Sequence, residues 1–140
     1  MNRNGPVIVI EDDIDDREVL KEVFDILKYP NEILFFHDGQ EALDHLNMSD
    51  DIPFLILSDI NMPKLTGFEL RDKIRMDAKL QVKCIPYLFF STASNQQAVV
   101  DAYSVSAQGF FKKDHSISEI QKTISIIMEY WMRCLAPKNF

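Results

Sequence analysis

The sequence is poor in positive charge, in cysteine and in long hydrophobic runs. Its 140 residues carry 15 Lys and Arg against 22 Asp and Glu, which gives a formal net charge of −7 and a pI near 4.9. A protein that binds nucleic acid or an anionic membrane needs a net basic face, so the charge balance argues against both as the main partner. Cationic ligands fit this balance better.

Cysteines and apolar segments are few and short. Cys84 and Cys134 lie far apart without a metal-ligand spacing, so we expect two reduced, buried thiols in a cytosolic protein. The first apolar run, residues 7–10, is too short for a signal peptide or a membrane span. We therefore expect a cytoplasmic protein that is neither secreted nor anchored.

The chain does contain five apolar runs, in a length that suits one domain. They are continuous rather than alternating, as expected for parallel strands covered on both faces. The runs are Val7–Ile10, Ile33–Phe36, Phe54–Leu57, Tyr87–Phe90 and Phe110–Phe111.

Between the runs, apolar residues recur at helical spacing. The last such stripe comprises Ile117, Ile120, Ile124, Ile127 and Trp131. Four capping-box patterns predict helix starts, namely Asp38-x-x-Glu41, Thr66-x-x-Glu69, Ser94-x-x-Gln97 and Ser116-x-x-Glu119. Five alternating strands and helices predict an α/β fold with a doubly wound parallel sheet. Ligands of such sheets bind beyond the carboxyl ends of the strands, so the candidate residues are those that follow each run.

Five acidic residues follow the first run within six positions: Glu11, Asp12, Asp13, Asp15 and Asp16. The last three are explained by the preference of helix N-termini for caps and negative charge. Glu11 and Asp12 should still lie at the strand end, where their carboxylates repel each other unless a cation intervenes. A calcium loop that starts at Glu11 is the competing interpretation, but its sixth position is Asp16, where glycine is required.

The other strand ends supply Asp59, Ser91, Thr92, Lys112 and Lys113. Asp59 should lie beside Glu11 and Asp12, because the first and third strands are neighbours in a doubly wound sheet. Together the strand ends offer carboxylates for a divalent ion, a carboxylate nucleophile, a hydroxyl and an ammonium group. This is the set of groups that phosphoryl transfer requires.

At these residues the chain resembles the receiver domain of two-component response regulators, in particular the single-domain chemotaxis type. The strongest match is the segment SDINMPKLTGFEL, residues 58–70, in which a Met-Pro pair follows an aspartate and a glycine stands eight residues on. The resemblance implies the strand order 2-1-3-4-5, a phosphoacceptor at Asp59 and a third helix that starts at Gly67. Since it covers essentially the whole chain, we expect one receiver domain over residues 1–140 and no output domain.

The resemblance also implies a Mg²⁺ site. Arg17 stands five residues after Asp12, and this register makes Glu11 and Asp12 the acidic pair of the family. Asp12 and Asp59 are then expected to bind Mg²⁺ through side-chain oxygens, with Glu11 in the same site. Asn61 is expected to contribute its backbone carbonyl.

A switch is implied at the fourth and fifth strands. Ser91, five residues after Pro86, becomes the switch hydroxyl, and Lys113, 22 residues further on, becomes the lysine of the family. The aromatic residue three positions before that lysine is Phe110, whose packing is expected to change on phosphorylation. Phe110 replaces a frequent tyrosine, and Asp114 replaces the usual proline, so no cis bond is assumed after Lys113.

The function implied is that of a stand-alone response regulator. It accepts a phosphoryl group from a sensor histidine kinase and signals through protein contacts. Whether it passes the phosphoryl group on to a histidine phosphotransfer protein is left open by the sequence. The helix after the fourth strand, the fifth strand and the last helix would form the readout surface. Ile126, Met128, Tyr130 and Met132 lie off the core stripe of the last helix, which indicates either a partner or homodimer surface, or deep burial.

Two other functions compete with this one. A phosphatase of the haloacid-dehalogenase type also uses an aspartate nucleophile, but it needs a second carboxylate two residues on, where this chain has Asn61. A degenerate receiver that binds partners without phosphorylation is the other alternative. The presence of Asp12, Asp59, Ser91 and Lys113 argues against it.

Overall fold

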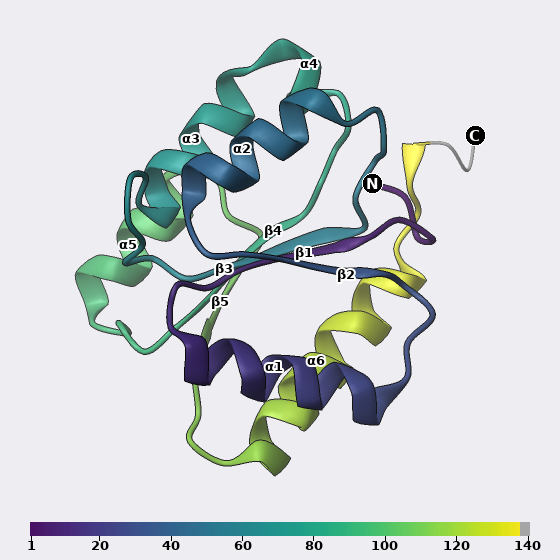
Figure 1. Cartoon of the computed structure of the whole chain (residues 1–140). Coiled ribbons are helices and arrows are strands. Elements are labelled where there is room, and N and C mark those ends of the chain that lie inside the picture. The colour runs from purple at the N-terminus through teal and green to yellow at the C-terminus, as the bar shows by residue number, and fades with distance from the viewer. Residues whose placement is uncertain (138–140) are drawn as a thin grey trace.

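Five parallel strands form the central sheet in the order β2-β1-β3-β4-β5 (Figure 1). The structure is a computed structural model and describes residues 1–137. The strands are β1 (Val7–Ile10), β2 (Ile33–Phe36), β3 (Leu55–Ser58), β4 (Tyr87–Ser91) and β5 (Gly109–Lys112). The predicted α/β class and strand order are therefore confirmed.

Helices cover both faces of the sheet (Figure 1). On one face lie α1 (Ile14–Leu27) and α6 (Ile117–Arg133). On the other lie α2 (Gly39–Met48), α3 (Gly67–Met76), α4 (Ala78–Gln81) and α5 (Gln96–Ser104). The short α4 is an addition to the five helices expected. It forms because the Asp77 side chain accepts hydrogen bonds from the backbone of Lys79 and Leu80, and Leu80 is buried.

The two faces of the sheet build two apolar clusters. Val7 and Val9 of β1 pack with α1 and α6, whereas Ile8 and Ile10 pack with the helices on the other face. Successive strand residues point to opposite faces, so a strand covered on both sides needs an apolar residue at every position. This explains the continuous runs.

The capping patterns predict two of the four helix starts in detail. Thr66 and Glu69 form both bonds of a capping box at α3, and Asp38 accepts from the backbone N–H of Glu41 at α2. The pattern at Ser94 is wrong by one residue, because the Asn95 side chain caps α5. Ser116 is the N-cap residue of α6 but makes no capping bond, since its hydroxyl pairs with that of Ser118.

The last helix buries a wider stripe than predicted. Ile120, Ile124 and Ile127 are buried as expected, but so is Met128, which follows Ile124 by one turn and joins the same cluster. Ile117 at the first turn is 39% exposed. The helix ends at Arg133.

The two thiols are free, as expected, but neither is buried. Cys84 is exposed because it lies in the turn after α4 with a left-handed backbone (φ 51°). Cys134 is half-buried at the end of α6. Their predicted burial is therefore wrong.

Gly67 begins α3 where the helix passes over the end of β3. A Cβ atom there would lie 2.3 Å from the carbonyl oxygen of Asp59 and 2.7 Å from the ring of Phe89. Because the backbone cannot yield easily, Gly67→Ala is expected to lower the free energy of unfolding by about 1–3 kcal/mol. Gly109→Ala is the control, since its nearest contacts are side-chain atoms at 3.2 and 3.3 Å. Equal urea midpoints for the two variants would contradict this expectation.

Candidate functional site

The carboxyl ends of the strands bring the predicted residues together. Ile10 of β1 pairs with Ser58 of β3, so the residues that follow them, Glu11 and Asp59, are adjacent. The ladder continues one residue beyond the strands, since the backbone N–H of Asp59 donates to the Ile10 carbonyl at 3.1 Å. At the other edge the N–H of Lys113 donates to the carbonyl of Ser91, the last residue of β4, at 2.9 Å.

Asp59 is held by three donors. Its Oδ1 accepts from the Ser91 hydroxyl and from the backbone N–H of Ile60, both at 2.7 Å, and its Oδ2 accepts from Lys113 Nζ at 3.2 Å. Burial by itself would raise the pKa of Asp59, but the Ser91 hydrogen bond and the Lys113 charge outweigh burial and hold it below its usual range. Asp59 is therefore an oriented carboxylate at neutral pH.

Lys113 is the cation of the site. Its side chain is only 7% exposed, and its Nζ contacts carboxylate oxygens of Glu11, Asp16 and Asp59. Burial opposes the charged form, but these carboxylates raise the pKa of Lys113 above its ordinary value. The ammonium group is therefore retained at every physiological pH.

Glu11, Asp12 and Asp59 place carboxylate oxygens within 4.8 Å of one another. Glu11 is 1% exposed, and its Oε2 atom has no hydrogen-bond partner among the residues that the structure describes. A buried acceptor without a donor is costly, and three hard oxygen donors form the set that Mg²⁺ prefers. The residues present therefore fit a divalent cation.

Glu11 gives this cluster a pH dependence. Burial raises the pKa of Glu11 to about 8, against the opposing effect of Lys113. A carboxyl group must be ionised to bind a cation, so Mg²⁺ affinity is expected to increase as the pH rises toward about 8 and to level off above it. In Glu11→Gln the affinity should be weaker and nearly independent of pH. Calorimetry across this range tests the expectation, which a flat wild-type profile would contradict.

The remaining predicted residues lie around this cluster. Asn61 is exposed, two residues past Asp59 in the connection to α3, and its role as a ligand stays a prediction. Ser91 is buried, and its Oγ also accepts from the backbone N–H of Ala93 at 3.2 Å. Phe110 is half-buried on β5, with its ring centroid 6.1 Å from that of Phe89. The peptide bond between Lys113 and Asp114 is trans.

The sequence did not point to Asp16 as part of the site. Its backbone N–H bonds the Asp13 cap as expected, but its Oδ2 accepts from Lys113 Nζ at 3.0 Å. In the sequence Asp16 is one acid among several in a first helical turn. Nothing there predicts a contact with a residue 97 positions away.

A second group of potential ligands lies at the start of α2 and has a structural explanation. His37 Nδ1 lies 3.0 Å from a Glu41 oxygen, and Lys64 Nζ lies 3.6 Å from Asp38 Oδ2. The backbone hydrogen bond from Glu41 lowers the pKa of Asp38, as befits a helix cap. The Oδ1 atom of Asp38 therefore accepts the capping hydrogen bond, and its Oδ2 atom has the Lys64 ammonium group as an ion-pair partner.

A larger cavity lies away from these carboxylates. It measures about 540 Å³ and is lined by residues that precede β4 and β5, such as Pro86 and Gln108, together with Arg71 and Cys84. It is thus at the amino ends of the strands, whereas the gap among Glu11, Asp59 and Lys113 measures only about 10 Å³. The reactive groups supplied by the strand ends therefore lie outside the larger cavity.

Comparison with known families gives the site its context. Residues 7–125 match the family described as the response regulator receiver domain. The chain belongs to this family. A response regulator receiver is a component of a two-component system, and the family implies a histidine kinase as partner. The chain is thus a receiver and not a phosphatase of the haloacid-dehalogenase type.

Individual relatives agree with this assignment over most of their length. The receiver is 25% identical to response regulator Rcp1 of Synechocystis over 131 residues, which cover 90% of this chain and 88% of Rcp1. It is 25% identical to chemotaxis protein CheY1 of Helicobacter pylori over 122 residues, which cover 87% and 95% of the two chains.

Solved structures show the same fold. The phosphorylated cyanobacterial phytochrome response regulator RcpA superposes with a TM-score of 0.84 at 26% identity, over 94% of this chain and 97% of RcpA. The Mn²⁺-bound form of Rcp1 superposes with a TM-score of 0.79 at 25% identity, over 94% and 99% of the chains. Receiver homologues therefore include one with a divalent metal site, and this receiver has an acidic cluster in its own pocket. No helix within residues 1–137 has the length and apolar character needed to cross a membrane.

Proposed function

We propose that this receiver accepts a phosphoryl group on Asp59 from the phosphohistidine of a sensor histidine kinase, in a Mg²⁺-dependent reaction in the cytoplasm. The observation that carries the proposal is the environment of Asp59. This ionised carboxylate is oriented by Ser91, lies 3.2 Å from the Lys113 ammonium group and adjoins two further carboxylates. We further propose that the chain forms one receiver domain and signals through protein contacts.

The residues divide the chemistry among them. A carboxylate oxygen of Asp59 attacks phosphorus in line with the phosphorus–nitrogen bond of the phosphohistidine, that bond breaks, and its electron pair returns to the imidazole. Lys113 pairs with the charge on the moving phosphoryl oxygens, as a cation in a water-poor site. Glu11, Asp12, Asp59 and the Asn61 carbonyl would hold Mg²⁺, which supplies charge neutralisation at the same oxygens.

Phosphorylation then changes the partners of Ser91. Its hydroxyl now donates to Asp59 Oδ1. After phosphorylation this atom is either the oxygen bonded to phosphorus or the carbonyl oxygen next to it. A phosphoryl oxygen offers a stronger, charged acceptor, so Ser91 and the loop after β4 move toward it. Phe110, half-buried beside Phe89, repacks as that loop moves.

The readout surface in this proposal consists of α5, β5 and α6. On α6, Ile126 is 57% and Tyr130 is 61% exposed, which suits a protein partner or a second copy of this chain. We propose that the chain forms a homodimer through α6, and that a histidine phosphotransfer protein is a further partner. Nucleic acid is not among the partners in this proposal. Sedimentation before and after phosphorylation tests the dimer. Only monomer in both states, with partner affinity unchanged by Tyr130→Ala, would contradict this surface.

The phosphoryl reaction is tested on the wild-type protein with a small acyl-phosphate donor. Intact mass spectrometry is expected to show an adduct of one phosphoryl group that is lost in mild base. The adduct should form in Mg²⁺ and not in EDTA. No adduct in Mg²⁺ would contradict the proposal and would favour a receiver that binds its partners constitutively.

A further inference from the structure

Asp16 supplies a third carboxylate to Lys113, from a different element than the other two. It lies in the first turn of α1, and its Oδ2 is 3.0 Å from Lys113 Nζ, closer than the 3.2 Å to Asp59 Oδ2. The Asp13 cap accepts from the backbone N–H of Asp16 at 3.0 Å and fixes this turn. The Asp16 side chain is 44% exposed, so this carboxylate is at the open side of Lys113.

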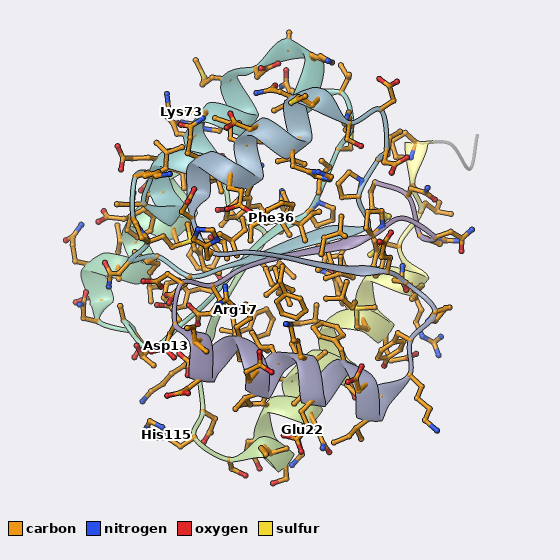
Figure 2. All side chains as sticks on the ribbon, in the orientation of Figure 1. Asp13, Arg17, Glu22, Phe36, Lys73 and His115 are labelled. Carbon is orange, nitrogen blue, oxygen red and sulfur yellow. The ribbon has the colours of Figure 1, made fainter. Side chains whose placement is uncertain are left out.

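Two spaces of very different size flank Lys113. Toward Glu11 and Asp59 the gap is about 10 Å³. On the other side a cavity of about 110 Å³, lined by Asp16 and His115 among others, separates α1 from the connection between β5 and α6. Figure 2 shows Asp13 at the start of α1 and His115 in that connection on the same side of the molecule. The larger of the two spaces beside Lys113 is therefore the one that Asp16 lines.

A cation among Glu11, Asp12 and Asp59 competes with Lys113 for two of the same carboxylate groups. Lys113 Nζ now contacts both Glu11 and Asp59, two of the three residues of that cluster. A divalent ion there also repels the ammonium group. Lys113 can give up part of its carboxylate contacts only if another acceptor is within reach, and Asp16 is that acceptor.

We infer that Asp16 is a positioning residue, which receives the Lys113 ammonium group when a divalent cation binds to Glu11, Asp12 and Asp59. The inference rests on the proposed function, because it requires that cation site. Without Asp16, Lys113 remains on Glu11 and Asp59 and competes more strongly with the cation. Asp16 thereby sets the affinity for the metal without touching it.

The test compares two first-turn acids that differ in this contact. Asp16→Asn and Asp15→Asn each remove one negative charge from the start of α1, but Asp15 is exposed and only Asp16 bonds Lys113. Asp16→Asn is expected to weaken Mg²⁺ binding, measured by calorimetry without any phosphodonor, by about two- to fivefold more than Asp15→Asn, the range for one partly exposed ion pair. Asp16→Glu should restore most of the affinity.

A double-mutant cycle separates the lysine contact from plain charge. In a Lys113→Met background there is no ammonium group to receive, so Asp16→Asn should weaken Mg²⁺ binding no more than Asp15→Asn does. An equal loss of Mg²⁺ affinity for the two variants in the wild-type background, or an Asp16→Asn effect that persists in Lys113→Met, would overturn the inference. Either result would leave the proposed cation site standing. A wild-type protein that binds no Mg²⁺ would overturn the proposed cation site as well.

Discussion

Phosphoryl uptake is expected to disappear in Asp59→Asn. Asparagine keeps the size of the side chain and an oxygen that accepts from Ser91 and from the N–H of Ile60, which now lie 2.7 Å from Asp59 Oδ1. The amide lacks the anionic oxygen that attacks phosphorus, and it replaces the ionised form that Ser91 and Lys113 stabilise. Intact mass after incubation with Mg²⁺ and an acyl phosphate should therefore show an adduct on the wild type and none on the variant.

Asp51→Asn is the matched control for this prediction. It makes the same chemical change at an exposed residue before β3, away from the cluster of carboxylates. Its adduct should form at the wild-type rate. If Asp59→Asn also acquires the adduct at the wild-type rate, the phosphoacceptor lies elsewhere.

The second large effect is expected at Lys113. In Lys113→Met the apolar stem is kept but the ammonium group that contacts Glu11, Asp16 and Asp59 is lost. A fixed cation in a buried site stabilises developing charge far more than one in water, so phosphorylation at saturating Mg²⁺ should slow by about 10²-fold. Mass spectrometry of samples quenched at successive times, over a range of donor concentrations, measures this rate.

The neighbouring lysine provides the comparison. Lys112 ends β5 and is exposed, so Lys112→Met removes the same charge without touching the site. Its rate should stay within about twofold of the wild type, as for an exposed charge that screening weakens. Equal slowing in both variants would show that net charge, rather than the position of Lys113, controls the reaction.

The fold was largely predictable, because helices cover both faces of the sheet (Figure 1) and its strands are therefore mostly apolar along their length. Continuous apolar runs such as Val7–Ile10 then mark parallel strands, and the residue after each run lies at the carboxyl edge of the sheet. This is why Glu11, Asp59 and Lys113 could be expected together from strand ends that are distant in sequence. Their chemical roles remain predictions for the experiments above.

Other features depend on packing that the sequence does not display. Met128 was expected off the core stripe, yet it is buried, because the apolar face of α6 is wider than one row of isoleucines. The cap of α5 is Asn95 rather than Ser94, a choice between two good capping residues. Asp16 reaches Lys113 only because α1 packs beside the connection from β5 to α6. A residue with an ordinary local explanation can thus hold a second, long-range contact.

The central claim is most directly tested by locating the phosphoryl group itself. The wild-type protein is phosphorylated in Mg²⁺ and treated with borohydride, which reduces an aspartyl phosphate to homoserine, and its peptides are then sequenced by mass spectrometry. The account predicts homoserine at position 59 in Mg²⁺ and unmodified Asp59 in EDTA. Modification at Glu11 or Asp12 instead, or an unmodified Asp59 in a protein that carries the adduct, would contradict it.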